Sequence, residues 1–548
     1  MTTLPRDSSP RDRAIDLPLH FPSATLPSAE MDLRRLRSPD GHGLYASAGE
    51  LYADAVFGRD SIEAAEDILH IRPDVARGVI LTLAHLQGTA DVPSGPNSSE
   101  EERGRIHHEH RQLNVDGRRI SPRSEELLRL LSQLWGGDGE SMTYYGSVDA
   151  TPLYVRLVAG FCERYGTSIL DEPTVDKDGR DSTVRASALL AVEWLERKLE
   201  QSSLDLVEFR RRNPRGIPFQ VWKDSGTSYV HRNGELANWE DAIAAVEVQG
   251  YTFDALLGAA QTLGRDLGSH ASRWREEAYR LRARVLEHFW MARDRYFAMG
   301  IDRDALGRTR QVDSIASNGA LLLDTSLFDA LPEAERYLQG VLERICGPEF
   351  LTEVGVRCRS LTDDGLVDFQ DYHGTWAVWL KEGYDIAKGL RRQGFPRLAN
   401  QVCIRLLNGV VVAREHAEFL YVSPDQRVHY DFRGRDHTGR RAKEILGTNV
   451  PEETQAWSVS AILATKWRFG GVRVTDDLPP RSDGWRRELE DELLSAMPHA
   501  HFLRGRVDRE AVYARRGDFT INLAAGIERD RAAREARRGC PESRRPTP

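Results

Sequence analysis

The stretch DSIEAAEDILHI, residues 60–71, opens the long helical part of this chain and shows its fold class. Asp60 and Ser61 stand where a helix cap is expected, and the apolar residues after them recur every three or four positions. The same spacing returns at residues 75–86, 125–135, 151–165, 182–199, 238–263, 270–290, 314–323, 333–345, 374–390, 395–411, 453–467 and 484–497. No sustained alternation of period two competes with these helices, so we predict an all-α fold.

The arrangement of these helices follows from their number and from the loops between them. The loops are long and rich in Gly, Asp, His and Trp, and long loops in a compact domain usually carry function. Paired helices with such loops suit a double ring, the (α/α)6 barrel, whereas a helical-repeat solenoid would show a fixed repeat that this chain lacks. We predict a mobile arm at residues 1–40, the barrel at 41–470, and a helical extension with a disordered basic tail at 471–548.

Composition excludes several classes of partner. The 548 residues include 75 basic and 84 acidic ones, which gives a net charge of -9 and no basic surface for nucleic acid. The 5 cysteines form no Cys-x-x-Cys pair, so neither a disulfide framework nor a thiolate metal site is indicated. The N-terminus lacks the apolar core of a signal peptide, and no apolar run approaches the roughly 20 residues of a membrane span. We therefore expect a cytoplasmic protein with no nucleic-acid and no membrane partner.

The run QVWKDSG, residues 220–226, places one carboxylic acid, Asp224, between Trp222 and a Ser-Gly turn. A carboxyl held against an indole is poorly hydrated, which disfavours its charged form and raises its pKa. A general acid needs this setting to keep a proton near neutral pH and give it to a glycosidic oxygen. A core tryptophan followed by a turn-forming aspartate is the structural alternative, which the heptapeptide alone leaves open.

Two further loops combine aromatic, acidic and basic side chains. Residues 57–61 place Arg59 beside Asp60, a pair that can clamp neighbouring sugar hydroxyls or simply cap a helix. Tyr145 and Asp149 precede another predicted helix, where the ring offers a stacking face for a sugar. Asp149 also suits the N-cap of that helix, and both roles can hold together.

Three more segments contribute candidate binding residues. The histidine-rich loop at 104–111 contains Glu109 but lacks the His-Glu-x-x-His spacing of a zinc site, so a hydrogen-bonding loop is favoured. Gln249 and Glu247 lie inside an otherwise apolar helical pattern, where a buried Glu is costly unless it is paired, which favours a role in a site. His373 and Trp376 stand together in a third aromatic and polar loop. We predict no metal ion and no cofactor.

A glycosidase needs a second carboxyl group on the other side of the scissile bond. Glu418 lies in the aromatic run HAEFLY at residues 416–421 and has little structural reason to be there. Glu453 stands at a predicted helix start, where the partial positive charge of the helix N-terminus already explains an acidic side chain. We therefore favour Glu418 and keep Glu453 as the alternative.

Taken together, these segments resemble the glucosidase domain of glycogen debranching enzymes and the related (α/α)6-barrel glycosidases, which include glucoamylases and mannosylglycerate hydrolases. The matching motifs follow the family's order at residues 57–61, 104–111, 144–152, 220–226, 247–251, 373–376 and 454–458. The resemblance implies inverting hydrolysis of an α-glucosidic bond in an oligosaccharide or small glucoside, of the amylo-α-1,6-glucosidase type. A carbohydrate is then the substrate partner.

The resemblance also implies roles for individual residues. Asp224 takes the place of the family's general acid, and Glu418 best matches its general base. The predicted substrate-binding residues are Arg59, Asp60, Glu109, Tyr145, Asp149, Trp222, Gln249, His373 and Trp376. The first 40 residues leave no room for the β-sandwich that usually precedes the debranching barrel, so a small α-glucoside is as plausible a substrate as a branched polymer. The alternatives are a sugar phosphorylase or epimerase on the same barrel and a non-catalytic carbohydrate-binding protein.

Overall fold

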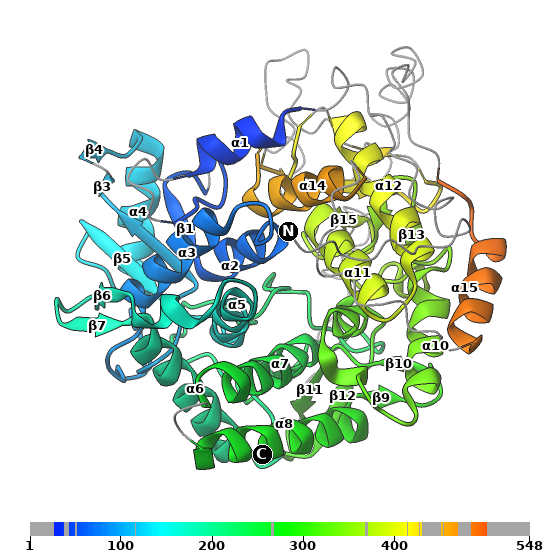
Figure 1. Ribbon diagram of the computed structural model, residues 1–548, viewed down its shortest axis with the longest axis horizontal. Coiled ribbons are helices and arrows are strands. Elements are labelled where there is room, and N and C mark those ends of the chain that lie inside the picture. Colours follow the sequence, from blue (N-terminus) through cyan, green and yellow to red (C-terminus); the bar gives the residue numbers. More distant parts are fainter. Residues whose placement is uncertain are drawn as a thin grey trace, which may run out of the picture.

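The computed structural model describes most of the chain: residues 27–37, 43–49, 52–115, 117–264, 268–367, 371–413, 415–426, 428–429, 451–452, 454–469 and 484–500. Most of the predicted arm and the predicted basic tail beyond residue 500 lie outside these ranges. Within them the fold is mainly helical (Figure 1). None of the helices in this part of the chain is both long enough and apolar enough to pass through a bilayer.

An inner set of helices packs side by side around the centre of the molecule (Figure 1). In chain order each member contacts the next, and the last returns to the first. The members are α2 (Gly58–Asp67), α5 (Ala150–Tyr165), α7 (Val246–Thr262), the 3-10 turn η4 (Leu322–Asp324), α11 (Leu380–Arg392) and α14 (Ala456–Phe469). Helix α14 shows why this set lies inside, since every residue from 456 to 465 is buried.

A second set of helices packs on the outside of the first, and one of its members, α10, reaches the first set through α9. These are α1 (Ala29–Leu36) on α14, α3 (Pro73–Leu86) on α2, α6 (Val184–Gln201) on α5, α8 (Gly268–His288) on α7, α10 (Ala334–Ile345) on α9 (Asn318–Leu321), and α12 (Pro396–Ala413) on α11. Helix α8 is typical, because its buried residues Ala271, Trp274, Ala278, Leu281 and Val285 form one stripe at helical spacing. Most of the other residues of α8 are polar and at least partly exposed.

Short antiparallel strands, which the sequence does not predict, correct the all-α expectation. Three sheets have three strands each: β1 (Ala55–Phe57), β2 (Glu109–Gln112) and β5 (Ser141–Tyr144); β12 (Thr309–Val312), β11 (Gly300–Arg303) and β8 (Ala244–Ala245); and β15 (Ala377–Trp379), β16 (Phe419–Val422) and β17 (Val428–His429). In each sheet one strand runs directly into an inner helix: β1 into α2, β8 into α7 and β15 into α11. Residues 374–379 are predicted helical, but β15 is buried on both faces and shows no period to tell strand from helix.

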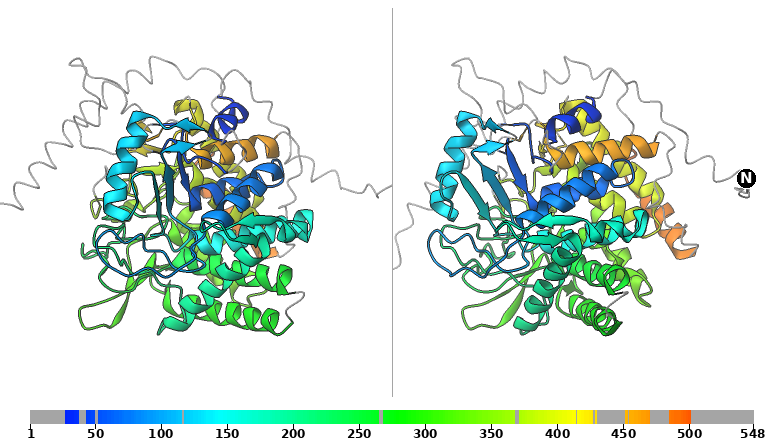
Figure 2. Two further views of the ribbon diagram at one scale, coloured as in Figure 1. Left: turned by 90° about the vertical axis from the view of Figure 1, so that its left-hand side faces the viewer. Right: turned by 60° about the vertical axis from the view of Figure 1, so that its left-hand side comes forward.

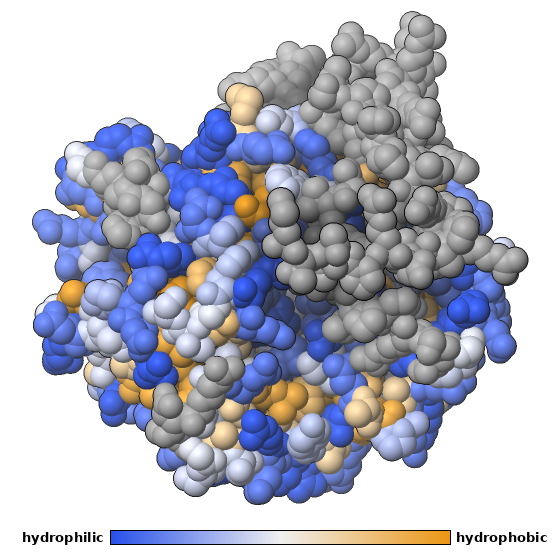
Figure 3. Space-filling view, in the orientation of Figure 1, coloured by the Kyte–Doolittle hydropathy of each residue, from blue (hydrophilic) through white to orange (hydrophobic). Residues whose placement is uncertain are grey.

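The remaining elements are short or peripheral. Four hairpins pair β3 (Asn114–Val115) with β4 (Arg118–Arg119), β6 (Pro173–Val175) with β7 (Asp181–Thr183), β9 (Trp290–Met291) with β10 (Tyr296–Phe297), and β13 (Leu351–Thr352) with β14 (Gly355–Val356). Within the described ranges, the other helices are α4 (Pro122–Trp135), α15 (Gly484–Ala496), η2 (Thr167–Asp171), η5 (Ser326–Phe328) and η6 (Leu361–Asp363). In the right-hand view of Figure 2 the β1–β2–β5 sheet lies between helix α4 and the inner helices. On the face drawn in Figure 3, hydrophilic residues predominate and apolar ones form small groups between them.

The start of α2 differs from the predicted cap. The helix begins at Gly58, so Asp60 and Ser61 lie inside its first turn, and the Ser61 hydroxyl donates to the Leu44 carbonyl at 3.1 Å. Gly58 is needed there because a Cβ atom would lie 2.1 Å from the His107 carbonyl oxygen. This close approach brings the 104–111 loop against the start of the helix.

Candidate active site

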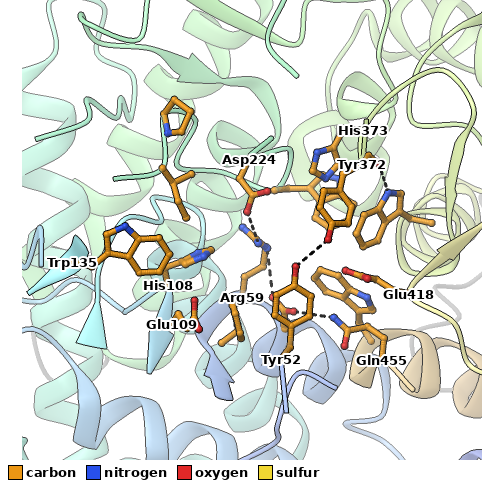
Figure 4. A pocket seen from close by; sticks show the side chains of 17 residues that line it. Tyr52, Arg59, His108, Glu109, Trp135, Asp224, Tyr372, His373, Glu418 and Gln455 are labelled. Atoms are coloured by element: carbon orange, nitrogen blue, oxygen red, sulfur yellow. Dashed lines mark hydrogen bonds and ion pairs between the residues drawn. The ribbon is translucent and has the colours of Figure 1, made fainter. Parts of the chain in front are cut away.

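A cavity of about 250 Å³ opens where loops and short strands meet the starts of the inner helices α2, α11 and α14 (Figure 4). Its walls come from segments far apart in the sequence, and they combine aromatic rings with carboxyl groups. The lining residues are Tyr52, Phe57, Arg59, Asp60, His108, Glu109, Trp135, Ile217, Pro218, Trp222, Asp224, Tyr372, His373, Trp379, Glu418, Gln455 and Trp457.

Arg59 is the centre of a cluster of carboxylates. Its guanidinium donates to Asp149 at 3.1 Å and forms ion pairs with Asp60 at 3.8 Å and Asp224 at 3.6 Å. These acids hold the pKa of Arg59 above its ordinary value against the opposing effect of burial. One cation thus faces three acids, and burial raises the pKa of Asp60 to about 7, with Asp224 and Asp149 adding to the rise and Arg59 opposing it.

Asp224 stands at the mouth of this cluster, with 29% of its side chain exposed. Burial raises its pKa to about 6, while Arg59 lowers it and Asp149 adds to the rise. Such a carboxyl exchanges its proton close to neutral pH, as a general acid must. The turn after it is fixed by Asp371, which accepts hydrogen bonds from Ser225 at 2.7 Å and from Thr227.

Glu418 lies at a different part of the cavity wall, beside Gln455 in Figure 4. Its side chain is buried and accepts a hydrogen bond from the Glu452 N–H at 3.0 Å. Burial raises the pKa of Glu418 well above its usual range, and the charges of Glu452, Asp60 and Asp224 act in the same direction. Gln455 in turn reaches Asp60 at 3.4 Å, so this wall continues into the Arg59 cluster.

Aromatic rings give the cavity rigid apolar faces. The Trp222 ring meets Trp379 and Trp457 edge to face, with centroids 4.8 Å and 5.1 Å apart. Elsewhere in the lining, Trp135 stacks on Tyr144 with centroids 4.3 Å apart and donates its indole N–H to the Arg215 carbonyl. The C–H faces of a sugar ring are apolar, so such rings suit a carbohydrate as well as any flat apolar group.

The two lining histidines are neutral near pH 7. Burial lowers the pKa of His108 and of His373 well below the ordinary value, and nearby cations, Arg59 among them, act the same way. His373 stacks on Trp379 and its Nδ1 lies 3.1 Å from the Ser225 hydroxyl. These rings therefore offer neutral hydrogen-bonding groups rather than charge.

The structure brings together most of the residues that the sequence singles out. Arg59, Asp60, Glu109, Trp222, Asp224, His373 and Glu418 all line the cavity. Glu109 also forms an ion pair with Arg111. The predicted alternative to Glu418, Glu453, lies outside the described residues.

Four predicted binding residues lie behind the lining instead. Asp149 precedes α5 as predicted but caps no backbone N–H, since its carboxylate holds Arg59. The Tyr145 hydroxyl donates to the Leu86 carbonyl at 2.8 Å. The Gln249 amide bonds the backbone of residue 207, and Trp376 packs against the hydrophobic core. In each case the side chain bonds to or packs against other parts of the fold. The sequence alone does not distinguish such a structural contact from contact with a substrate.

Several lining residues were not singled out from the sequence. Trp379 lies in a segment with a helical pattern, where a tryptophan normally indicates core, and Trp457 lies in the 454–458 motif but was given no role in the site. Tyr52 and Trp135 belong to no motif of mixed polarity, and the Tyr52 hydroxyl meets the Tyr372 hydroxyl at 3.4 Å only through the fold. Among the described residues, no three His, Cys, Asp or Glu side chains are grouped as metal ligands would be.

No protein-family model and no curated protein matches the sequence. Among solved structures, the GH63 mannosylglycerate hydrolase from Thermus thermophilus in complex with glucose is 16% identical, with 80% of this chain and 98% of that chain covered and a TM-score of 0.47. An uncharacterized conserved protein from the same organism is 15% identical, with coverage of 80% and 98% and a TM-score of 0.48. A glycosidase variant is 12% identical, with coverage of 81% and 96% and a TM-score of 0.44. These values describe a distant likeness over most of the chain and assign no family.

Proposed function

We propose that this protein is an inverting glycoside hydrolase that cleaves an α-glucosidic bond at the end of an oligosaccharide or in a small glucoside. The observation that carries the proposal is one cavity that holds two carboxyl groups of raised pKa, Asp224 and Glu418, together with the Arg59–Asp60 pair. Acid-catalysed glycoside cleavage needs two carboxyl groups around the scissile bond. The aromatic walls supply the apolar faces that a sugar ring requires.

We also propose that the helices form an (α/α)6 barrel. The closed circuit from α2 through α5, α7, η4, α11 and α14 supports an inner ring. The helices packed outside it support a second ring. The site then lies at the end of the barrel where the inner helices begin, which agrees with lining residues at the starts of α2, α11 and α14.

In the proposed mechanism Asp224 is the general acid. It gives its proton to the glycosidic oxygen as the bond breaks, and a pKa of about 6 leaves a usable protonated fraction near neutral pH. Arg59 and Asp60 hold hydroxyls of the terminal sugar. Glu418 in its ionised form takes a proton from the water that attacks the opposite face of the ring.

One observation favours the reverse assignment of acid and base. Burial raises the pKa of Glu418 well above its usual range, whereas Arg59 lies 3.6 Å from Asp224 and lowers the pKa of that carboxyl. The adjacent cation favours the ionised form of Asp224, which is the form that a general base needs. Glu418 as acid and Asp224 as base is accordingly the second candidate, and the two assignments make opposite predictions.

The lining supports hydrolysis over phosphorolysis and favours a small substrate. Among the described lining residues, the acids Asp60, Glu109, Asp224 and Glu418 outnumber the one guanidinium, that of Arg59, so a phosphate anion is poorly matched. A cavity of about 250 Å³ is below the usual range for drug-sized ligands. It suits a terminal sugar better than the interior of a polymer.

The activity is tested by an NMR time course on maltose, isomaltose, trehalose, glucosylglycerate, mannosylglycerate and a branched limit dextrin. Initial release of the β-anomer from an α-glucoside is the expected result, and release from the limit dextrin alone would assign amylo-α-1,6-glucosidase action. Turnover that requires phosphate would assign a phosphorylase, and a rearranged sugar an epimerase. Binding without turnover of any compound would leave a carbohydrate-binding protein.

The roles of the two carboxyls are separated by α-glucosyl fluoride, whose leaving group needs no proton. Asp224→Asn should lose about 10²-fold or more in turnover of an ordinary α-glucoside while keeping most fluoride hydrolysis. Glu418→Gln should lose both activities, because the water is no longer activated. The opposite pattern would reverse the two roles, and full activity in both variants would refute the pair.

A further inference from the structure

The residue before Asp224 is a lysine that has no contact with solvent. Lys223 is 0% exposed and does not line the cavity, so its side chain runs into the protein interior while Asp224 faces the site. Its ammonium lies 2.5 Å from Glu382 Oε1. Glu382 is itself only 1% exposed and lies in the first turn of the inner helix α11.

Glu382 binds more than the lysine. Its carboxylate also accepts the indole N–H of Trp222 at 3.2 Å, the Ser317 hydroxyl at 2.6 Å and the Cys358 thiol at 3.2 Å. One buried carboxylate therefore holds both residues that precede Asp224. The last two donors fix that carboxylate to α9 and to the strand region before α11.

A buried ion pair of this kind is a poor device for stability. Taking Lys223 and Glu382 out of water carries a large desolvation cost, and apolar side chains of the same volume often serve stability equally well. What the pair does supply is direction, since a charge-assisted hydrogen bond fixes its partners more tightly than apolar packing does. Because Glu382 holds both Trp222 and Lys223 from the protein interior, the next residue, Asp224, has little freedom except to face the cavity.

The far side of the same turn is held independently. Asp371 accepts hydrogen bonds from Ser225 and Thr227, and the buried Arg359 donates to the Ser228 carbonyl at 2.5 Å. Asp224, whose carboxyl lines the cavity, thus lies between two segments of the turn that are each held by side chains from elsewhere in the fold.

We propose that the Lys223–Glu382 pair positions the Asp224 carboxyl for proton transfer, so that both are positioning residues of the reaction. The proposal rests on the proposed function of Asp224 as the general acid. It predicts that damage to the pair impairs protonation of the leaving group more than it impairs sugar binding or water attack.

The kinetic test uses Lys223→Met, Glu382→Gln and the double variant that carries both. Each single variant should lower turnover of an α-glucoside at least tenfold, with KM changed less than about threefold and with α-glucosyl fluoride hydrolysis changed less than about threefold. The double variant should recover part of the loss, because neither partner is left as an unpaired buried charge. An equal loss on both substrates, or unchanged turnover, would overturn the proposal.

The matched control is Lys388→Met, which removes a different, largely buried lysine that lies in α11. Lys388 bonds Asp67 at 2.8 Å and lies 3.6 Å from Asp324, so its loss should lower the unfolding temperature. It touches no residue of the 220–228 turn in any described contact, so the ratio of the two activities should stay at the wild-type value.

A second readout does not depend on activity. Hydrogen–deuterium exchange of a peptide that covers residues 219–228 should become faster in both single variants and stay unchanged in the Lys388→Met control. If the wild type cleaves neither the α-glucosides nor the fluoride, the proposed function fails, and the exchange data still decide whether the pair anchors the turn. Unchanged exchange in Lys223→Met would refute the anchor.

Discussion

Replacing the proposed general acid with its neutral analogue, Asp224→Asn, should make the protein more stable at neutral pH while it removes activity. The reason is the raised pKa of Asp224, about 6 against an ordinary 3.8, which burial causes. Ionising this carboxyl in the folded protein is harder than in the unfolded chain. An asparagine of the same shape escapes that cost.

The size of the effect follows from the two pKa values. A difference of one pH unit corresponds to about 1.4 kcal/mol, so at pH 7 the ionised Asp224 destabilises the fold by about 3 kcal/mol. Since 29% of the side chain is exposed, that figure is an upper value. The folded state binds the proton more tightly, so the cost appears as pH rises from about 3.8 to about 6 and falls below about 1 kcal/mol at pH 4.

The assay is urea unfolding of the wild type and the variant, followed by circular dichroism at pH 4 and pH 7. The variant should unfold at higher urea at pH 7, and the two proteins should nearly coincide at pH 4. Asp149→Asn is the control, because the Asp149 carboxylate holds the buried Arg59 at 3.1 Å, so this change should destabilise the fold. A variant less stable than wild type at pH 7, or a difference independent of pH, would refute the reasoning.

Two further predictions concern the start of α2. Gly58→Ala should cost about 3 kcal/mol or more, because its Cβ would lie 2.1 Å from the His107 carbonyl, while Gly226→Ala, with nothing within 4 Å, should change stability by less than about 1 kcal/mol. Thermal unfolding measures both, and equal effects would contradict the steric argument. Arg59→Met should raise the pKa of Asp224, since Arg59 lowers it, and move the alkaline limb of kcat/KM to higher pH by about one unit or more. The pH–rate profile checks this, and an unmoved limb would exclude Arg59 as the group that tunes Asp224.

The helical class of the fold could be predicted from the sequence, but the strands could not. Helices such as α5 and α12 bury long apolar faces, and their periodicity survives over several turns. The strands β8 and β15 have two and three residues, are buried on both faces and run straight into helices. A segment that short shows no period, so its state is decided by the neighbouring strand that pairs with it.

For the candidate site, the sequence determined which chemistry was available and where along the chain it gathered. Trp222, Lys223 and Asp224 are adjacent because they are consecutive in the chain. Arg59, Asp60 and Glu418 were predicted as site residues because their segments mix aromatic and charged side chains. Only the tertiary structure decided which of these share one cavity. The physical reason is that local sequence fixes spacing within one loop, whereas burial and pKa depend on partners from distant segments.

Glu382 shows this division most clearly. In the sequence it is an ordinary acid in a helical pattern, with nothing to link it to a turn some 160 residues earlier. In the fold it is buried beneath that turn and holds both Trp222 and Lys223. Its role exists only because the helix start and the turn are brought together inside the protein, where water cannot replace either partner.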